Sequence, residues 1–432
     1  MASIRKIFMV IVDAIAYFAS LFILDLLRYH QIEWGFLDQN IRLFAFLFPI
    51  WAITAYILDL WQPPKLRNKS ILFKNLLLSI VIFVLFSTIF LYIFGGFFVA
   101  QPKTNLILFS LIFLVLAYLA KSVLSSLFVS LKTKVLFLDD NSATAQLLSH
   151  LQTNPGLGYE PRMISGDQNK ELKSIIDQEE GDVIVIFPDA CIDKRFIETL
   201  YNLLPTKADI CKLSDFYELI FLKEPLEFLD EGWFVNNLRS KRVFNLLKRV
   251  VDIILSLLLL IILCPIFLLC FLAIKIFSPG KAIFCQKRRG KNNKDFTTYK
   301  FRTMTPNHDN NPWTIENDPR ITKIGKIFRS THLDELPQLY NILIGEMSFV
   351  GPRAESSNLA DLYSKNIPYY EIRNTVKPGL TGWAQIHYKP SVSVVEGAEK
   401  LKYDFFYIKN RSVILDFLIL LKTVKLIFVN PK

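Results

Sequence analysis

The sequence predicts a membrane protein of three parts: a four-helix transmembrane bundle, a cytosolic α/β module, and a mostly helical domain with its own membrane hairpin. Three observations predict this architecture. The 432 residues are 52% hydrophobic and include 37 phenylalanines, more apolar than an average soluble protein. Four long apolar segments open the chain, and strand-like and helix-like segments then alternate. A fifth apolar segment interrupts the basic remainder. We place the domains at residues 1–133, 134–230 and 231–432.

The four opening segments, at residues 7–27, 43–60, 71–94 and 106–120, each approach the ~20 residues that cross a bilayer as a helix. Lys and Arg cluster before the first segment, between the second and third, and after the fourth, so both ends of the bundle are expected in the cytoplasm. No small-residue cleavage site follows the first segment, which argues against a signal peptide. We interpret Asp13, Asp25 and Asp59 as helix-end or bundle-facing residues rather than a proton path.

The formal net charge of +11 fits this topology, contact with anionic membrane lipids, and phosphate-bearing substrates. We expect no nucleic-acid partner. The five cysteines show no paired metal spacing and the five histidines are scattered. These counts predict a reduced, cytosol-facing protein without a histidine metal site.

An α/β unit is expected over residues 134–221. Strands are predicted at 135–138, 182–187 and 208–213, and helices at 143–151 and 196–204. This alternation indicates a parallel sheet. The turn after the first strand, residues 139–144, lacks the glycines that let a backbone approach a pyrophosphate. The unit is therefore interpreted as structural or regulatory rather than dinucleotide-binding.

The fifth apolar segment carries Cys264-Pro265 at its middle, and we place a membrane helix at 250–277. Its flanking basic residues are Lys241, Arg242, Lys248 and Arg249 before it, and Lys275, Lys281, Lys287 and Arg288 after it. Because both flanks favour the cytoplasm and proline breaks a helix, a hairpin that enters one leaflet and returns is expected. A proline-kinked spanning helix is the alternative.

Basic residues recur among glycines and prolines after this hairpin. Arginine supplies forked donors that match phosphate oxygens. The pattern predicts a phosphate site built from Lys300, Arg302, Arg320, Arg329 and Arg353.

Two adjacent carboxylates, Asp334 and Glu335, lie among these residues. Pro337 is tolerated in a first helical turn, so a helix is expected to begin near Asp334 and to favour anions there. One carboxylate can attack phosphorus while the other holds Mg²⁺, which prefers oxygen ligands. The alternative is a helix cap, since Thr331 and Asp334 have capping-box spacing.

The segment from Lys241 onward resembles the bacterial sugar transferase family, the monotopic polyprenol-phosphate phosphoglycosyl transferases. The matching text, in order, is KFRTM, NDPRIT, LDELPQL, GEMSFVGPR and KPGLTGWAQI. The segment before it resembles the larger members, which carry a four-helix bundle and a Rossmann-like, CoA-binding-like domain.

The resemblance implies that Asp334 is the nucleophile, Glu335 the second member of the dyad, and Arg329 and Arg353 family arginines. It implies Mg²⁺, a UDP-sugar donor, undecaprenyl phosphate as acceptor, release of UMP, and a covalent phosphosugar-aspartyl intermediate. It also implies a place in the bacterial inner membrane with the catalytic domain on the cytoplasmic face, and suggests a homodimer. The family breaks its hairpin at Ser-Pro, and here Cys264 stands in the serine position before Pro265.

Two other functions are weighed against this one. A membrane-anchored protein that only binds a nucleotide-sugar would not need the Asp-Glu pair or Arg353. A transferase that attacks directly, without a covalent intermediate, would carry its aspartates on loops between many spans.

Overall fold

A computed structural model of the chain describes residues 2–29, 34–61, 69–94, 103–130, 132–138, 141–164, 182–186, 209–229, 233–234, 237, 241–277, 280–305, 320–391 and 393–429. The chain divides into two compact units, Met1–Phe216 and Tyr217–Lys432. The predicted boundaries at 133/134 and 230/231 are finer than this division and stay predictions.

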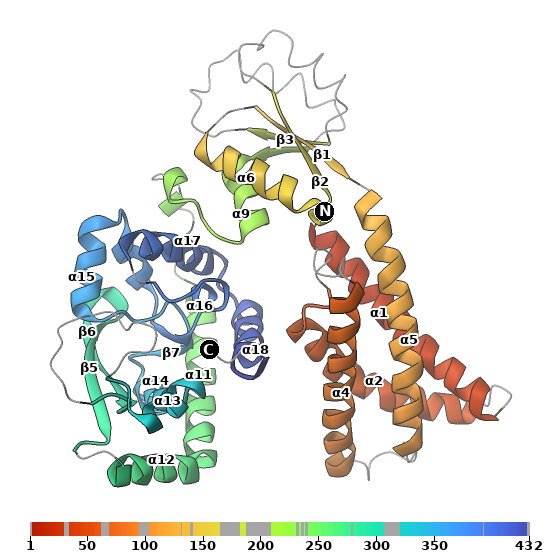
Figure 1. Cartoon of the computed structure of the whole chain (residues 1–432), viewed down its shortest axis with the longest axis horizontal. Helices are drawn as coiled ribbons and strands as arrows, with labels where there is room; N and C mark the ends of the chain where they lie inside the picture. Colours follow the sequence, from red (N-terminus) through yellow and green to blue (C-terminus); the bar gives the residue numbers. More distant parts are fainter. Residues whose placement is uncertain are drawn as a thin grey trace. The chain divides into compact units, whose positions relative to one another are not determined.

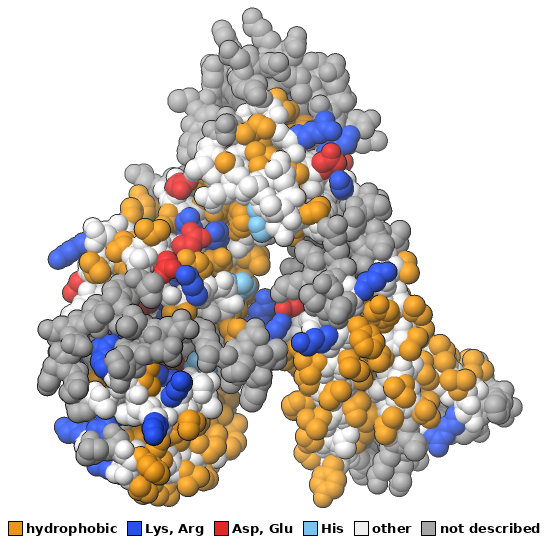
Figure 2. Space-filling view, viewed as in Figure 1, with side chains coloured by type: hydrophobic (Ala, Val, Ile, Leu, Met, Phe, Trp, Pro, Cys, Tyr) orange, Lys and Arg blue, Asp and Glu red, His pale blue; other side chains and the backbone are white. Residues whose placement is uncertain are grey.

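Four long helices open the first unit: α1 (Ala2–Tyr29), α2 (Trp34–Ile57), α4 (Lys69–Phe94) and α5 (Lys103–Ser130) (Figure 1). Each is long and apolar enough to cross a membrane, which confirms the four predicted membrane helices. Tyr17 lies at the centre of the bundle, where its ring contacts those of Phe48, Phe109 and Phe113 and its hydroxyl donates to the Phe44 carbonyl. Figure 2 shows the outward side of the bundle covered with apolar side chains.

An ion pair is buried inside this bundle. Lys121 Nζ of α5 lies 2.8 Å from Asp13 Oδ1 of α1, and both side chains are 0% exposed. Trp61 Nε1 donates to the other aspartate oxygen at 2.7 Å, and Lys121 also donates to the Leu60 carbonyl. Asp13 is thus a bundle-facing residue, as expected, and it joins the first helix to the fourth.

A parallel four-stranded sheet follows the bundle, in the order β2-β1-β3-β4. Its strands are β1 (Thr133–Phe137), β2 (Tyr159–Met163), β3 (Val183–Ile186) and β4 (Asp209–Lys212), with α6 (Ser142–Thr153) between the first two and α9 (Leu213–Phe221) after the last. The predicted parallel sheet is confirmed, whereas the Rossmann-like assignment stays a prediction. The helix expected at 196–204 lies outside the described residues.

Strand β2 lies at the edge of the sheet, where proline is tolerated. It was not predicted because Pro161 breaks the strand pattern of the sequence.

The glycine-free turn after β1 leads into α6, where the Asn141 side chain accepts the backbone N–H groups of Ala143 and Thr144. The donors that a phosphate would need are therefore already used.

The second unit is mostly helical. Its α-helices are α11 (Arg242–Ile262), α12 (Cys264–Phe277), α13 (Lys323–Ser330), α14 (Gln338–Ile344), α15 (Ser357–Asn366), α16 (Trp383–His387), α17 (Val394–Asn410) and α18 (Val413–Val429). Its strands form an antiparallel hairpin, β5 (Ile283–Arg289) with β6 (Asp295–Phe301), and a short parallel pair, β7 (Ser348–Val350) with β8 (Gly379–Thr381). Single 3₁₀ turns are η3 (Leu226–Phe228), η4 (Lys291–Asn293), η5 (Leu333–Glu335) and η6 (Tyr370–Thr375).

The start of the second unit is tied to α16 and α17. Lys409 of α17 pairs with Glu218 at 2.5 Å and with Glu224 at 2.8 Å. Trp383 Nε1 of α16 donates to the Leu222 carbonyl at 2.8 Å. Residues 217–229 therefore pack as part of this unit.

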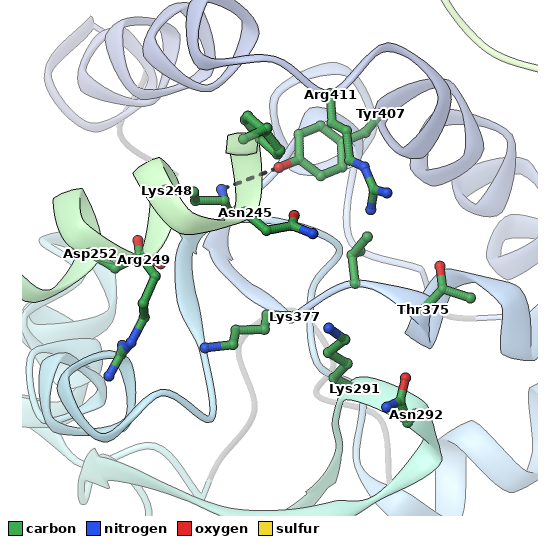
Figure 3. Close-up of a pocket in the computed structure, with 12 residues that line it drawn as sticks. Asn245, Lys248, Arg249, Asp252, Lys291, Asn292, Thr375, Lys377, Tyr407 and Arg411 are labelled. Atoms are coloured by element: carbon green, nitrogen blue, oxygen red, sulfur yellow. Dashed lines mark hydrogen bonds between the residues drawn. The ribbon is translucent and has the colours of Figure 1, made fainter. Parts of the chain in front are cut away.

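Helices α11 and α12 meet at a bend of 62° beside Leu263. Pro265 lies in the first turn of α12, where its missing N–H costs no helical bond, and Cys264 is exposed. Exposed apolar side chains cover this end of the unit (Figure 2). The first two turns of α11 line a cavity (Figure 3). The bend fits a re-entrant hairpin, and the path through a membrane stays a prediction.

Candidate active site

The Asp334-Glu335 pair lies in the single 3₁₀ turn η5 between α13 and α14. The turn begins at His332, whose backbone is left-handed with φ of 56°. Thr331 donates its hydroxyl to the Ile327 carbonyl at 2.8 Å, so it closes α13 and does not form a capping box with Asp334. Helix α14 begins at Gln338 rather than near Asp334, because Pro337 occupies its N-cap.

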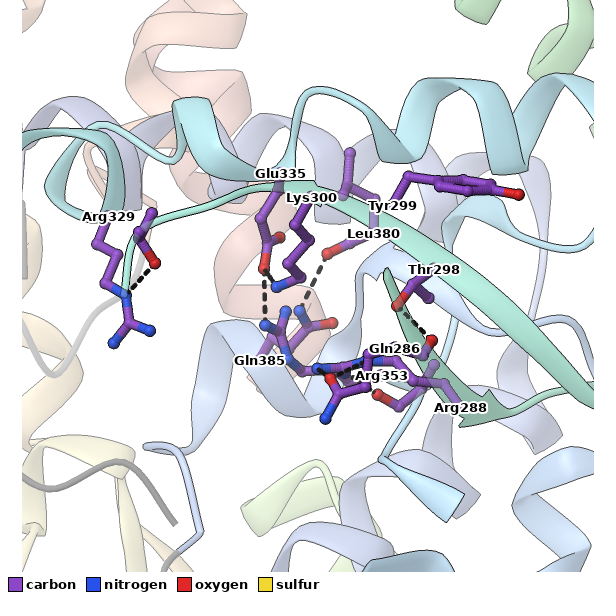
Figure 4. Close-up of polar contacts among 12 residues, drawn as sticks. Gln286, Arg288, Thr298, Tyr299, Lys300, Arg329, Glu335, Arg353, Leu380 and Gln385 are labelled. Atoms are coloured by element: carbon purple, nitrogen blue, oxygen red, sulfur yellow. Dashed lines mark hydrogen bonds and ion pairs between the residues drawn. The ribbon is translucent and has the colours of Figure 1, made fainter. Parts of the chain in front are cut away.

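Glu335 forms the centre of an ion-pair cluster. Its Oε1 accepts from Lys300 Nζ at 2.5 Å and from Arg353 Nη2 at 2.8 Å (Figure 4). Burial alone would raise the pKa of Glu335, but Arg353 and Lys300 outweigh it and hold that pKa well below its ordinary value. Glu335 in turn raises the pKa of Arg353. The glutamate is therefore held in its anionic form, and it positions two cations contributed by β6 and the segment after β7.

Asp334 differs from Glu335 in its hydrogen-bond partners and in the direction of its pKa shift. Its side chain is 9% exposed, and it makes no hydrogen bond with another described residue. Burial raises its pKa, Glu335 adds to that, and Lys300 and Arg329 act in the opposite direction. A carboxylate without partners beside several cations is suited to attack an anionic phosphate, because the cations reduce charge repulsion.

Arg329 reaches the site from the last turn of α13. Its Nε donates to the hydroxyl of Thr303 at 3.0 Å (Figure 4). Helix α13 approaches this part of the chain closely at Gly325, where a Cβ would lie 2.0 Å from the Thr303 carbonyl oxygen. The glycine therefore sets the distance between α13 and the segment after β6.

The structure places the remaining predicted cations differently. Arg302 lies just past the end of β6, where its N–H donates to the Ala282 carbonyl. The Arg320 carbonyl accepts from the N–H of Thr305. Neither belongs to the ion pairs of Glu335, whose partners are Lys300 and Arg353. The residues Asn317 to Pro319 of the same motif lie outside the described residues.

Sequence reasoning missed three groups near the cluster. Arg288 of β5 donates to the Ala354 carbonyl, and burial followed by repulsion from Arg353 lowers its pKa. Glu355 pairs with Lys400, which helps to hold the pKa of the glutamate at about 2 against the opposing effect of burial. Gln385 donates to the Leu380 carbonyl, and its Oε1 is buried without a partner in the described part of the chain. Arg288 and Gln385 stood within motifs that the sequence singled out, but nothing in the motifs distinguished them.

The residues around the dyad match the coordination needs of the implied Mg²⁺. The described residues contain no cluster of three or more metal-ligating side chains. Mg²⁺ commonly binds one or two carboxylates and completes its shell with water and substrate phosphate. Asp334 meets that need, and both cations at Glu335 contact Oε1, which leaves Oε2 outside these two ion pairs. The dyad therefore fits Mg²⁺ bound together with a substrate diphosphate.

Similar proteins define the class of this chain as a membrane-associated sugar transferase. The family model described as bacterial sugar transferase matches residues 243–430. A UDP-glucose:undecaprenyl-phosphate glucose-1-phosphate transferase of Escherichia coli is 33% identical over 317 residues, which cover 69% of this chain and 68% of that protein. The chain belongs to the bacterial sugar transferase family.

Two further relatives match mainly the second half. A UDP-N-acetylgalactosamine-undecaprenyl-phosphate N-acetylgalactosaminephosphotransferase of Aeromonas hydrophila is 37% identical over 195 residues, 45% of this chain and 46% of that protein. The chain thus spans about half the length of this relative. An exopolysaccharide production protein of Rhizobium leguminosarum is 41% identical over 186 residues, 41% of this chain and 93% of that protein.

Proposed function

We propose that this protein transfers a sugar-1-phosphate from a UDP-sugar to undecaprenyl phosphate, which gives undecaprenyl-diphosphate-sugar and UMP. The observation that carries the proposal is the largely buried Glu335, which holds Lys300 and Arg353 next to Asp334, a carboxylate with no hydrogen-bond partner among the described residues. The named activities of the relatives support the substrates. The reaction would be the first membrane step in assembly of a surface glycan.

The reaction proceeds in two displacements at one phosphorus. An Asp334 oxygen attacks the sugar-bearing phosphorus of the UDP-sugar, the bond to the bridging oxygen breaks, and UMP departs with the electron pair. A phosphosugar-aspartyl intermediate remains. An oxygen of undecaprenyl phosphate then attacks the same phosphorus and releases the Asp334 carboxylate. Lys300, Arg329 and Arg353 stabilise the charge on the transferring phosphoryl group, and Arg302 and Arg320 are assigned to binding substrate phosphate.

Magnesium is the proposed cofactor, held by Asp334 and Glu335 together with the diphosphate. When bound, it would neutralise charge that develops on the phosphate oxygens. UMP release is expected to stop in excess chelator and to return with added Mg²⁺. Full turnover in chelator would remove the metal from the proposal.

The proposal also covers the membrane hairpin, the Rossmann-like module and the oligomeric state. Residues 250–277 form a re-entrant hairpin broken at Cys264-Pro265, so that the catalytic domain stays on the cytoplasmic face of the bacterial inner membrane. The Rossmann-like module has no assigned chemistry, and the protein acts as a homodimer. Cysteine labelling near Lys248 and near Lys281 should report the same side of the membrane, and labelling from opposite sides would support the kinked spanning helix.

A direct displacement without a covalent intermediate is the second candidate, and one experiment separates the two. Without lipid acceptor, the wild-type protein should release about one UMP per active site and retain the sugar-phosphate on the peptide that contains Asp334. Asp334→Asn keeps the shape, removes the attacking oxyanion, and should abolish both UMP release and the adduct. Asp361→Asn, on the exposed α15, is the matched control that should behave like wild type. UMP release that appears only with acceptor, with no adduct by mass spectrometry, would support direct transfer. Neither adduct nor UMP under any condition would support a protein that only binds nucleotide-sugar.

A further inference from the structure

A second cationic cavity lies at the start of α11, apart from the dyad. It has a volume of about 310 Å³ (Figure 3). Five cations from four parts of the unit line it: Lys248 and Arg249 of α11, Lys291 of η4, Lys377 before β8, and Arg411 between α17 and α18. None of them is a residue of the Asp334-Glu335 cluster.

The carboxylates near the cavity are already engaged. Asp252 lines it but accepts from the Ser348 hydroxyl and the Phe349 N–H, both at 3.1 Å. Asp416 pairs with Lys248 and accepts from Tyr407. Counting both carboxylates against the five cations leaves a net charge of about +3 around the cavity, a setting that attracts anions.

Lys291 and Lys377 make neither an ion pair nor a side-chain hydrogen bond with any described residue, and Arg249 makes no ion pair with one. Burial, and then repulsion from Arg249, lowers the pKa of the half-buried Lys377. Arg249 donates instead to the carbonyls of Ile342 and Leu343 at the end of α14. A Cβ on Gly345 would lie 3.1 Å from the Arg249 guanidinium and 3.3 Å from Lys377 Nζ, so this glycine keeps room for both cations. An anion between them would relieve their repulsion.

The helices beside the cavity are apolar on the outside. In the same turns of α11, Val243, Leu246 and Leu247 are 73%, 66% and 50% exposed. Ile414, at the start of α18 next to Arg411, is 73% exposed. Cations in the same turns as exposed apolar side chains suit a lipid that has an anionic headgroup. The phosphate would enter the cavity, and the acyl chains would lie along the helices.

We propose that this cavity binds the phosphate headgroup of an anionic membrane phospholipid, as a site separate from the one that performs phosphoryl transfer. It would hold α11 at a fixed depth where the helix enters the lipid. The proposal goes beyond the sugar transfer proposed above and does not depend on it.

The test compares two charge-matched double variants of the full chain, purified in neutral detergent. Lys291→Gln with Lys377→Gln removes the two cations that have no side-chain partner among the described residues. No carboxylate loses an ion-pair partner in this variant. Lys294→Gln with Lys365→Gln removes two exposed lysines that do not line the cavity. Native mass spectrometry then measures retention of dioleoyl phosphatidylglycerol, with dioleoyl phosphatidylcholine as the neutral comparison.

Wild type and the 294/365 variant should retain phosphatidylglycerol in preference to phosphatidylcholine. The 291/377 variant should retain it roughly 30-fold more weakly, from about fivefold per lysine near a lipid surface. UMP release in neutral detergent serves as the folding control and should be unchanged.

Three outcomes would overturn the proposal. The first is equal phosphatidylglycerol retention by both double variants. The second is displacement of the lipid by millimolar inorganic phosphate or UMP, which would assign the cavity to soluble phosphates. The third is a 291/377 variant that keeps phosphatidylglycerol but loses affinity for undecaprenyl phosphate, which would make the cavity part of the acceptor site. Because retention is measured without substrate, failure here leaves the proposed transfer reaction untouched.

Discussion

Asp334 and Glu335 are adjacent in the chain, yet the fold gives them opposite electrostatic environments. Glu335 is neutralised by two cations that touch one of its oxygens, and its pKa is depressed. Asp334 lacks such partners in the described structure, and its pKa is raised by burial. Two carboxylates with divergent pKa values mark a division of labour, in which one residue organises cations and the other reacts.

Arg329 is expected to control the pH at which Asp334 becomes reactive. The attacking form is the carboxylate, so activity should fall as the pH drops through the pKa of Asp334. Arg329 lowers that pKa, and Arg329→Gln should therefore move the acid limb of the kcat profile to higher pH. Plateau kcat should also fall on the order of a hundredfold, because a charge-stabilising donor is lost.

Arg329→Lys provides the control for charge alone. It should return the acid limb to its wild-type position while leaving kcat reduced, since lysine cannot reproduce the Nε contact with Thr303. An acid limb that does not move in Arg329→Gln would show that Arg329 does not act on Asp334.

At the scale of single elements, the sequence predicted those features that depend on residues close together in the chain. Hydropathy located the four long helices, and the Cys264-Pro265 pair located the bend. The sequence could not tell which basic residues contact Glu335, because its partners lie 35 and 18 residues away and only the assembled fold joins them. Arg302 is basic and only two positions from Lys300, but it lies just after the end of β6 and does not contact Glu335.

The position of α13 offers a test at this scale. Gly325→Ala would put a methyl carbon 2.0 Å from the Thr303 carbonyl oxygen, so the helix that carries Arg329 has to move. We expect a loss of about 1–3 kcal/mol in unfolding free energy together with reduced UMP release. Thermal unfolding in detergent measures the first quantity.

Gly35→Ala is the matched control, because no atom lies within 4 Å of the added Cβ. It should leave stability unchanged or raise it by up to about 1 kcal/mol, as expected for alanine in a helix. If Gly325→Ala also left the unfolding free energy unchanged, the close approach of α13 to Thr303 would not contribute to stability.

At the scale of the whole molecule, the division into two compact units predicts where the chain can be cut. A truncated protein that begins at Tyr217 keeps Glu218 and Glu224, the partners of Lys409. It should fold and release UMP. A protein that begins at Glu231 loses both carboxylates and should be less stable by about 1–3 kcal/mol, because buried charge pairs are broken.

Thermal unfolding and UMP release by the two truncated proteins measure this difference. Adding Lys409→Gln to the shorter protein should recover part of the stability, since the uncompensated cation is gone. Equal stability of the two truncated proteins would contradict the role given to residues 217–229.

The buried pair of Asp13 and Lys121 has a consequence for how the protein is made. Asp13 of α1 is synthesised before Lys121 of α5, which follows 108 positions later. At about 5–20 residues per second, the aspartate waits roughly 5–20 s for its cation. Trp61 is synthesised before the lysine and donates to the same carboxylate, a bond that the folded bundle keeps. We expect the bundle to close only once α5 has been synthesised, when the aspartate meets its cation.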